Sequence, residues 1–145
     1  MPFEFSLRSL LRLRRVYEQR ERLRLALLNS SRTRAHNEFE EAGRQAMLGF
    51  EELDRKLQVG LSGGEFHLEE TILQLVGKQR RDLEALIGAL DLQMRKQVEV
   101  FWESQKKRKV LESLRDSQRK AFEQIENRRE QQRLDDLFAR RRIKS

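Results

Sequence analysis

The stretch Val59-Gly60-Leu61-Ser62-Gly63-Gly64-Glu65-Phe66 separates two long segments of helix-forming sequence. It holds three of the seven glycines, which favour positive φ and weaken helices. The only proline, Pro2, lies far from it. On both sides the chain is rich in Leu, Arg, Glu, Gln, Lys and Ala, which have high helix propensity. The sequence therefore predicts a helix over about residues 7–58, a turn at 59–66 and a second helix over about 67–140.

A short connection between two helices makes them antiparallel neighbours. Charged residues make up 38% of the chain and aromatic residues 7%, which suits a narrow apolar seam better than a broad core. A chain of 145 residues is typical of one domain. The predicted fold is all-α: a single domain over residues 1–145, formed by a long antiparallel two-helix coiled-coil hairpin.

Apolar residues recur at alternating steps of three and four in both predicted helices, which is the coiled-coil spacing. The first predicted stripe comprises Leu7, Leu10, Leu13, Val16 or Tyr17, Leu23, Leu27, Ala35, Phe39, Ala42, Ala46, Phe50, Leu53 and Leu57. The second comprises Ile72, Val76, Leu83, Leu86, Leu90, Met94, Phe101, Leu111, Leu114, Phe122 and Ile125.

Facing residues of an antiparallel pair have numbers with a constant sum. The two predicted stripes agree on this register, because Ala42 with Leu83 gives 125 and Leu10 with Leu114 gives 124. The first helix then runs out opposite Phe122, so the second helix is expected to overhang from about residue 126.

The net charge of +7 is unevenly distributed along the chain. Residues 1–34 carry nine Lys/Arg and three Asp/Glu, residues 35–103 carry eight and fourteen, and residues 104–145 carry fourteen and seven. A hairpin folded at 59–66 brings the two basic segments together at one end and leaves a mildly acidic turn. Such polarity suits a part that engages a different partner at each end.

No pattern of catalytic or metal-ligating residues emerges from the sequence. The two histidines, His36 and His67, do not form a ligand pair, and the chain has no cysteine. Neither an enzyme activity, a cofactor nor a metal is expected. No apolar run reaches the length of a transmembrane helix. Basic runs such as 105–109 could contact phosphates, but interspersed acids and the lack of a recognisable reading module argue against nucleic acid.

Short motifs near both ends carry a resemblance to a known family. They are Phe3-x-Phe5-x-Leu7-x-x-Leu10-Leu11-x-x-Arg14, Phe101-Trp102 with Lys106-Lys107, and Glu126-Asn127-Arg128 through Leu134-Asp135-Asp136-Leu137-Phe138-Ala139. In these residues and in its architecture the sequence resembles the FliJ family of the bacterial flagellar type III export apparatus.

The resemblance implies a coiled coil similar to the γ subunit of F-type ATPases. It implies insertion of the terminal end into the hexameric flagellar export ATPase, contact of the other end with the membrane export gate protein, and a part in cycling export chaperones. The expected location is cytoplasmic, peripheral at the inner face of the cell membrane. Two alternatives remain: a chaperone-like binder of export substrates or their chaperones, and a basic coiled coil that binds nucleic acid.

Two sets of residues are the expected binding sites. Those expected to bind the ATPase are Arg8, Arg12, Arg15, Arg128, Arg133, Leu134, Leu137, Phe138, Arg140 and Arg141. Those expected to bind the gate, because they are more apolar than a turn requires, are Phe50, Leu57, Leu61, Phe66 and Leu68.

Overall fold

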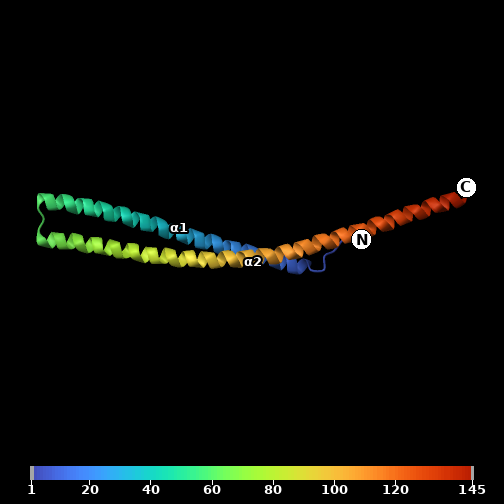
Figure 1. The fold of residues 1–145 in the computed structure, drawn as a ribbon, viewed down its shortest axis with the longest axis horizontal. Helices are drawn as coiled ribbons and strands as arrows, with labels where there is room; N and C mark the ends of the chain where they lie inside the picture. The colour runs from blue at the N-terminus through green and yellow to red at the C-terminus, as the bar shows by residue number, and fades with distance from the viewer. Residues whose placement is uncertain (1, 145) are drawn as a thin grey trace. The chain divides into compact units, whose positions relative to one another are not determined.

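The computed structural model describes residues 2–144, which form two helices joined by a short connection (Figure 1). Helix α1 spans Arg8–Val59 and helix α2 spans Gly63–Lys144. The described residues contain no strand. The predicted all-α helical hairpin is therefore confirmed, with its turn inside the predicted stretch. Helix α2 begins four residues before its predicted start, and ends four residues after its predicted end.

The turn is shorter than the glycine content suggests, because a helix cap forms on each side of it. Gly60 has a φ of 110° and its backbone N–H donates to the carbonyl oxygen of Lys56 at 3.0 Å, which closes α1 with a left-handed residue. The hydroxyl of Ser62 accepts a hydrogen bond from the backbone N–H of Glu65 at 3.2 Å, which is the bond of a helix N-cap. Gly63 and Gly64 consequently belong to the first turn of α2.

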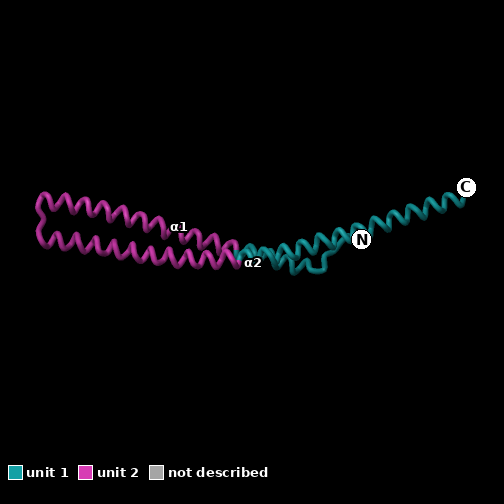
Figure 2. The backbone as a smooth tube through the Cα atoms, viewed as in Figure 1, with its two compact units in different colours: residues 1–21, 101–145 teal, residues 22–100 magenta. Residues whose placement is uncertain are grey.

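The described chain divides into two compact units, coloured separately in Figure 2. Unit 1 contains residues 2–21 and 101–144, and unit 2 contains residues 22–100. Both helices contribute to both units. That the chain folds as a single domain stays a prediction.

In unit 2 the two helical segments lie side by side and meet at the turn (Figure 2). An ion pair joins Arg32 to Asp91, and the Nζ of Lys56 lies 2.7 Å from the Oε1 of Glu69. The predicted seam is confirmed here only in part. Its members Ala35, Ala42, Leu83 and Leu90 are buried, whereas others are exposed.

In unit 1 the segment before α1 packs against α2. Phe5, Leu11 and Leu111 form a small buried cluster, and Phe3 packs against it. The ring of Phe3 lies 5.7 Å from the ring of Phe122. Past this contact the rest of α2 continues alone (Figure 2), and every residue from 127 to 144 is exposed. The predicted overhang is thereby confirmed, and residues 127–144 are called the overhang below.

The predicted stripe of α1 is wrong in its first half. Leu11 is 2% exposed, whereas the predicted Leu10 and Leu13 are 37% and 44% exposed. Further along α1, Glu18 and Glu21 are buried, whereas the predicted Leu23 and Leu27 are exposed. Members of the two predicted stripes that the structure leaves exposed are Leu7, Leu10, Leu13, Val16, Leu23, Leu27, Phe50, Leu57, Ile72, Leu86, Leu114 and Ile125.

The physical reason is that the heptad seam continues through polar residues. On α2, buried or half-buried positions recur at alternating steps of four and three from Glu69 to Arg115. This series includes Arg80, whose guanidinium lies 4.4 Å from the ring of Phe39, and Arg108, which pairs with a buried carboxylate. Charged residues such as these thus occupy seam positions. A search for apolar residues alone places leucines in the seam instead.

Candidate functional site

A partly buried ion cluster links the two helical segments of unit 1. Arg108 donates from its Nε and Nη2 to the carboxylate of Glu18, the second of these bonds being 3.3 Å long. Its Nη1 donates to Glu112 Oε2 at 2.6 Å, and Glu112 also accepts from Arg15 Nη2 at 3.2 Å. The Glu18 side chain is 7% exposed and that of Arg108 is 19% exposed. The hydrogen bond that Arg108 donates to Glu18 raises the pKa of Arg108 above its ordinary value, because it stabilises the charged form.

Beside this cluster lies an arginine-lined groove of about 470 Å³. Its lining residues are Phe3, Glu4, Phe5, Arg8, Leu11, Arg12, Arg15, Arg115 and Arg119, and this set is called the arginine groove below. Three members, Arg8, Arg12 and Arg15, belong to the predicted ATPase-binding set. The structure adds Arg115 and Arg119 from α2, which the sequence reasoning missed.

The overhang carries the rest of the predicted ATPase-binding set. Leu134, Leu137 and Phe138 are 42%, 50% and 64% exposed, and with Arg141 they line an open hollow of about 170 Å³ on the surface of this one helix. Their spacing of three and four residues puts them on one side of the helix. Arg133 lies 3.5 Å from Glu130 in a solvent-exposed pair. The remaining predicted members, Arg128 and Arg140, are also exposed on this helix.

At the turn of unit 2 a second groove, of about 550 Å³, has an apolar part formed by Val59, Leu61 and Leu68. Its polar lining residues are Arg55, Lys56, Glu65 and Glu69. Two of the predicted gate-binding residues, Leu61 and Leu68, therefore share one groove with Val59, which the sequence reasoning did not include.

The other three predicted gate-binding residues do not line this groove. Phe50 and Leu57 on α1 are 60% and 51% exposed, and Phe66 on α2 is 38% exposed. The structure thus brings together only part of the predicted set.

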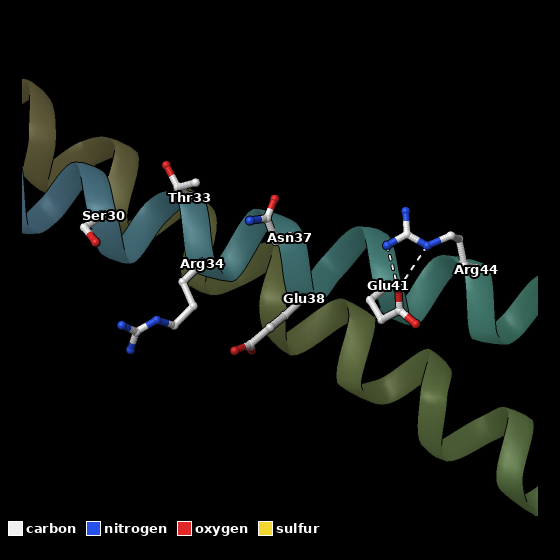
Figure 3. A pocket seen from close by; sticks show the side chains of 7 residues that line it. All are labelled: Ser30, Thr33, Arg34, Asn37, Glu38, Glu41 and Arg44. Atoms are coloured by element: carbon white, nitrogen blue, oxygen red, sulfur yellow. Dashed lines mark hydrogen bonds and ion pairs between the residues drawn. The ribbon is translucent and has the colours of Figure 1, made fainter.

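A shallow hollow of about 760 Å³ follows the outer side of α1 in unit 2, as Figure 3 shows. All seven of its lining residues come from α1: Ser30, Thr33, Arg34, Asn37, Glu38, Glu41 and Arg44. Arg44 donates from its Nε to Glu41 at 3.0 Å, and this bond raises the pKa of Arg44. Because one helix supplies every side chain, no second wall encloses a ligand, and the hollow is a solvated helix face.

Comparison with known families decides the identity. A family model described as Flagellar FliJ protein matches residues 3–145. The chain belongs to the FliJ family. Comparison with curated proteins and with solved structures gave no match.

Family membership makes this FliJ-family chain a component of the flagellar export apparatus. Within residues 2–144, no group of three or more His, Asp or Glu side chains is arranged to hold a metal ion. His36, for instance, only contacts Glu40 on its own helix, at 3.1 Å. Over the same residues, no helix combines the length and the apolar character needed to cross a membrane.

Charge distinguishes the two units of the FliJ-family chain. Unit 1 contains 19 Lys/Arg and 11 Asp/Glu, a net charge of +8, whereas unit 2 contains 12 and 13, a net charge of −1. The basic character of the protein therefore resides in the unit that carries the arginine groove and the overhang. A strongly basic surface favours acidic partners and speeds their association.

Proposed function

We propose that this chain is a non-enzymatic stalk of the flagellar type III export machinery. Its unit 1 inserts into the hexameric export ATPase and regulates hydrolysis, and its turn contacts the membrane export gate. The observation that carries the proposal is the overhang, a fully exposed helix with one apolar side. An isolated helix of this length is marginal in water, so a binding partner would stabilise it.

The chemistry of the overhang suits docking against another protein. Leu134, Leu137 and Phe138 are large apolar residues that remain 42–64% exposed in the described chain. Fully burying one such side chain contributes about 1.5–3 kcal/mol. The flanking Arg133 and Arg141 present planar guanidiniums that bind carboxylates in a bidentate manner. An apolar anchor surrounded by arginine is typical of residues that dominate interface energies.

The turn of unit 2 offers a chemically different surface. Val59 and Leu68 are 85% and 61% exposed, and together with Leu61 they form the apolar part of the turn groove. A compact apolar groove with charged residues on its rim is a common form of protein interface. This surface supports a protein contact at the turn, which the proposal assigns to the gate.

The stalk performs no chemistry of its own and acts mechanically. Binding of unit 1 would bias the conformations of the ATPase subunits, and contact at the turn would couple their cycle to the gate. The proposed location is cytoplasmic, peripheral at the inner face of the cell membrane. Membership in the FliJ family supports this location.

The proposal is tested by reciprocal variants at the two surfaces. Leu134→Ala/Phe138→Ala is expected to reduce stimulation of the export ATPase and to leave gate binding unchanged. Leu61→Ser/Leu68→Ser is expected to reduce gate binding and to leave stimulation of the export ATPase unchanged. Each variant is the matched control of the other. The proposal fails if both variants retain full ATPase stimulation, or if both lose both activities while helicity by circular dichroism is unchanged.

A second function, binding of export chaperones or their cargo, is supported by apolar residues that the seam does not use. Leu23 and Leu27 are 59% and 60% exposed and lie one turn apart on α1. Leu23→Ser/Leu27→Ser is expected to weaken chaperone binding in a pull-down with purified components. Unchanged capture would remove this second function.

A further inference from the structure

The arginine groove concentrates positive charge that the protein itself neutralises only in part. Five arginines line it and Glu4 is its only acidic lining residue. Within residues 2–144, neither Arg8 nor Arg12 makes an ion pair or a side-chain hydrogen bond. The Nε of Arg115 is buried and has no hydrogen-bond partner. That atom is out of a ligand's reach, so the exposed Arg8 and Arg12 are the groups that a ligand in the groove would meet first.

The backbone places these arginines in two converging rows. Arg8, Arg12 and Arg15 follow one another at steps of four and three, so they share one side of α1. Arg115 and Arg119 are four residues apart on α2 and line the same groove. Guanidiniums on two opposed helices can therefore reach a single segment lying between them.

Aromatic side chains hold part of the groove in place. The guanidinium of Arg119 lies 5.9 Å from the centre of the Phe3 ring, and that ring packs against Phe122. Phe5 and Leu11 are buried beneath and make the floor apolar. A groove formed in advance loses less conformational entropy when it binds.

We propose that the arginine groove binds a short acidic peptide segment carrying at least two carboxylates on adjacent helical turns or in one loop. The inference rests on the proposed function in one respect: the export ATPase is the partner that supplies the segment. Carboxylates match the fork of donors on each guanidinium, and the apolar floor accommodates the methylene groups or an apolar neighbour of the acidic residues.

The surroundings favour a short acidic segment over a nucleic acid. Two of the five groove arginines are already bonded to carboxylates, Arg15 to Glu112 and Arg115 to Asp116 at 3.4 Å, so the free cations form a small local group. Glu4 adds a carboxylate to the lining. A phosphate backbone needs a longer run of cations, whereas one acidic segment needs only this local cluster.

The groove is tested on the full chain with a labelled probe. A fluorescein-labelled peptide with four glutamates and one phenylalanine is titrated by fluorescence anisotropy, and the same peptide with glutamine for glutamate is the probe control. Arg12→Gln/Arg119→Gln is expected to weaken binding of the acidic peptide at least tenfold. Arg133→Gln/Arg140→Gln removes the same net charge from the overhang and is expected to weaken it less than twofold.

A variant that keeps the positive charge shows whether the groove needs the bidentate geometry of arginine or only its charge. Arg12→Lys/Arg119→Lys is expected to recover only part of the affinity, because an ammonium does not bind a carboxylate in a bidentate manner. Equal losses in the groove and overhang variants, or no loss in either, would overturn the proposal. A single-stranded DNA oligomer that binds the groove more tightly than the peptide would also overturn it.

Binding of the purified export ATPase distinguishes this inference from the proposed function. If the ATPase binds the parent chain and Arg12→Gln/Arg119→Gln equally but not Leu134→Ala/Phe138→Ala, the assignment of the groove to the ATPase is wrong and the proposed function stands. If the ATPase binds none of them, the proposed function fails, and the peptide titration still decides what the groove binds.

Discussion

Arg108→Met is expected to destabilise unit 1 by about 3 kcal/mol. The variant removes two hydrogen bonds to Glu18 and one to Glu112, in a place where the Glu18 and Arg108 side chains are 7% and 19% exposed. Breaking a buried ion pair by removing one partner costs about 3–5 kcal/mol. The lower value is expected because Glu112 keeps its bond to Arg15 and Glu18 retains a further interaction.

Urea denaturation measures this change with two readouts. Circular dichroism follows all the helices, whereas the fluorescence of Trp102 follows unit 1, which contains the only tryptophan. Arg44→Met is the matched control, because Arg44 pairs with Glu41 on the solvated side of α1. The control is expected to leave the midpoint unchanged, since exposed pairs contribute little. A shift for Arg108→Met no larger than that of the control would refute the reasoning.

Replacing both partners separates the cost of breaking the pair from its net contribution. Glu18→Leu/Arg108→Leu is expected to be as stable as the parent, or more stable by about 1–4 kcal/mol, because an apolar pair avoids the cost of burying two charges. The single variant Glu18→Leu is expected to be destabilised as Arg108→Met is. If the double variant were less stable than both single variants, the ion pair itself would be the source of net stability.

The pH dependence of the pair follows from the direction of the pKa shift. The hydrogen bond that Arg108 donates to Glu18 raises the pKa of Arg108. A cation whose pKa is raised on folding contributes stability below its unfolded pKa and loses it only as the pH rises through the folded value. For an arginine this window lies far above neutral pH. The difference in stability between the parent and Arg108→Met is therefore expected to stay constant from pH 7 to pH 10.

Two further sets of variants test the turn and the glycines. Gly60→Ala is expected to lower stability by about 1–2 kcal/mol, because Gly60 has a φ of 110°. Gly88→Ala is expected to raise stability by about 1 kcal/mol, because a Cβ at this position meets nothing within 4 Å. Thermal melts in which both variants shift the melting temperature in the same direction would contradict this prediction. The hydrogen bond to Glu69 raises the pKa of Lys56, so its stabilising effect is present below the unfolded pKa and is lost as the pH rises through the folded one. The difference between the parent and Lys56→Met is expected to shrink between pH 9 and pH 12, and a constant difference would show that the pair contributes nothing.

Sequence patterns suffice for the hairpin and for part of the seam of unit 2. Ala42 and Leu83, identified from the coiled-coil spacing, are buried, whereas the predicted Phe50 and Leu86 are exposed. The start of α1 is different, since Leu7, Leu10, Leu11 and Leu13 point in several directions and leave the phase of the stripe ambiguous. There the phase depends on charged residues that pair across the seam, which a search for apolar residues misses.

In the candidate sites too, features within one helix could be predicted from the sequence, whereas features that need both helices could not. The apolar stripe of the overhang, Leu134 to Phe138, follows from spacing within one helix. The contribution of Arg115 and Arg119 to the arginine groove depends on which residues of α1 face α2, and there the prediction placed Leu10 and Leu13 in the seam instead of Leu11. The start of α2 was predictable in principle, because Ser62-x-x-Glu65 matches the spacing of a helix N-cap.

Hydrolysis by the export ATPase in the presence of a chain that lacks residues 127–145 tests the stalk assignment most directly. Residues 127–144 are all exposed, so their removal leaves the cluster of Phe5, Leu11 and Leu111 and the contact of Phe3 with Phe122 in place. The truncated chain is expected to remain helical and to lose stimulation of hydrolysis. Full stimulation by a folded truncated chain would contradict the assignment of this surface to the ATPase.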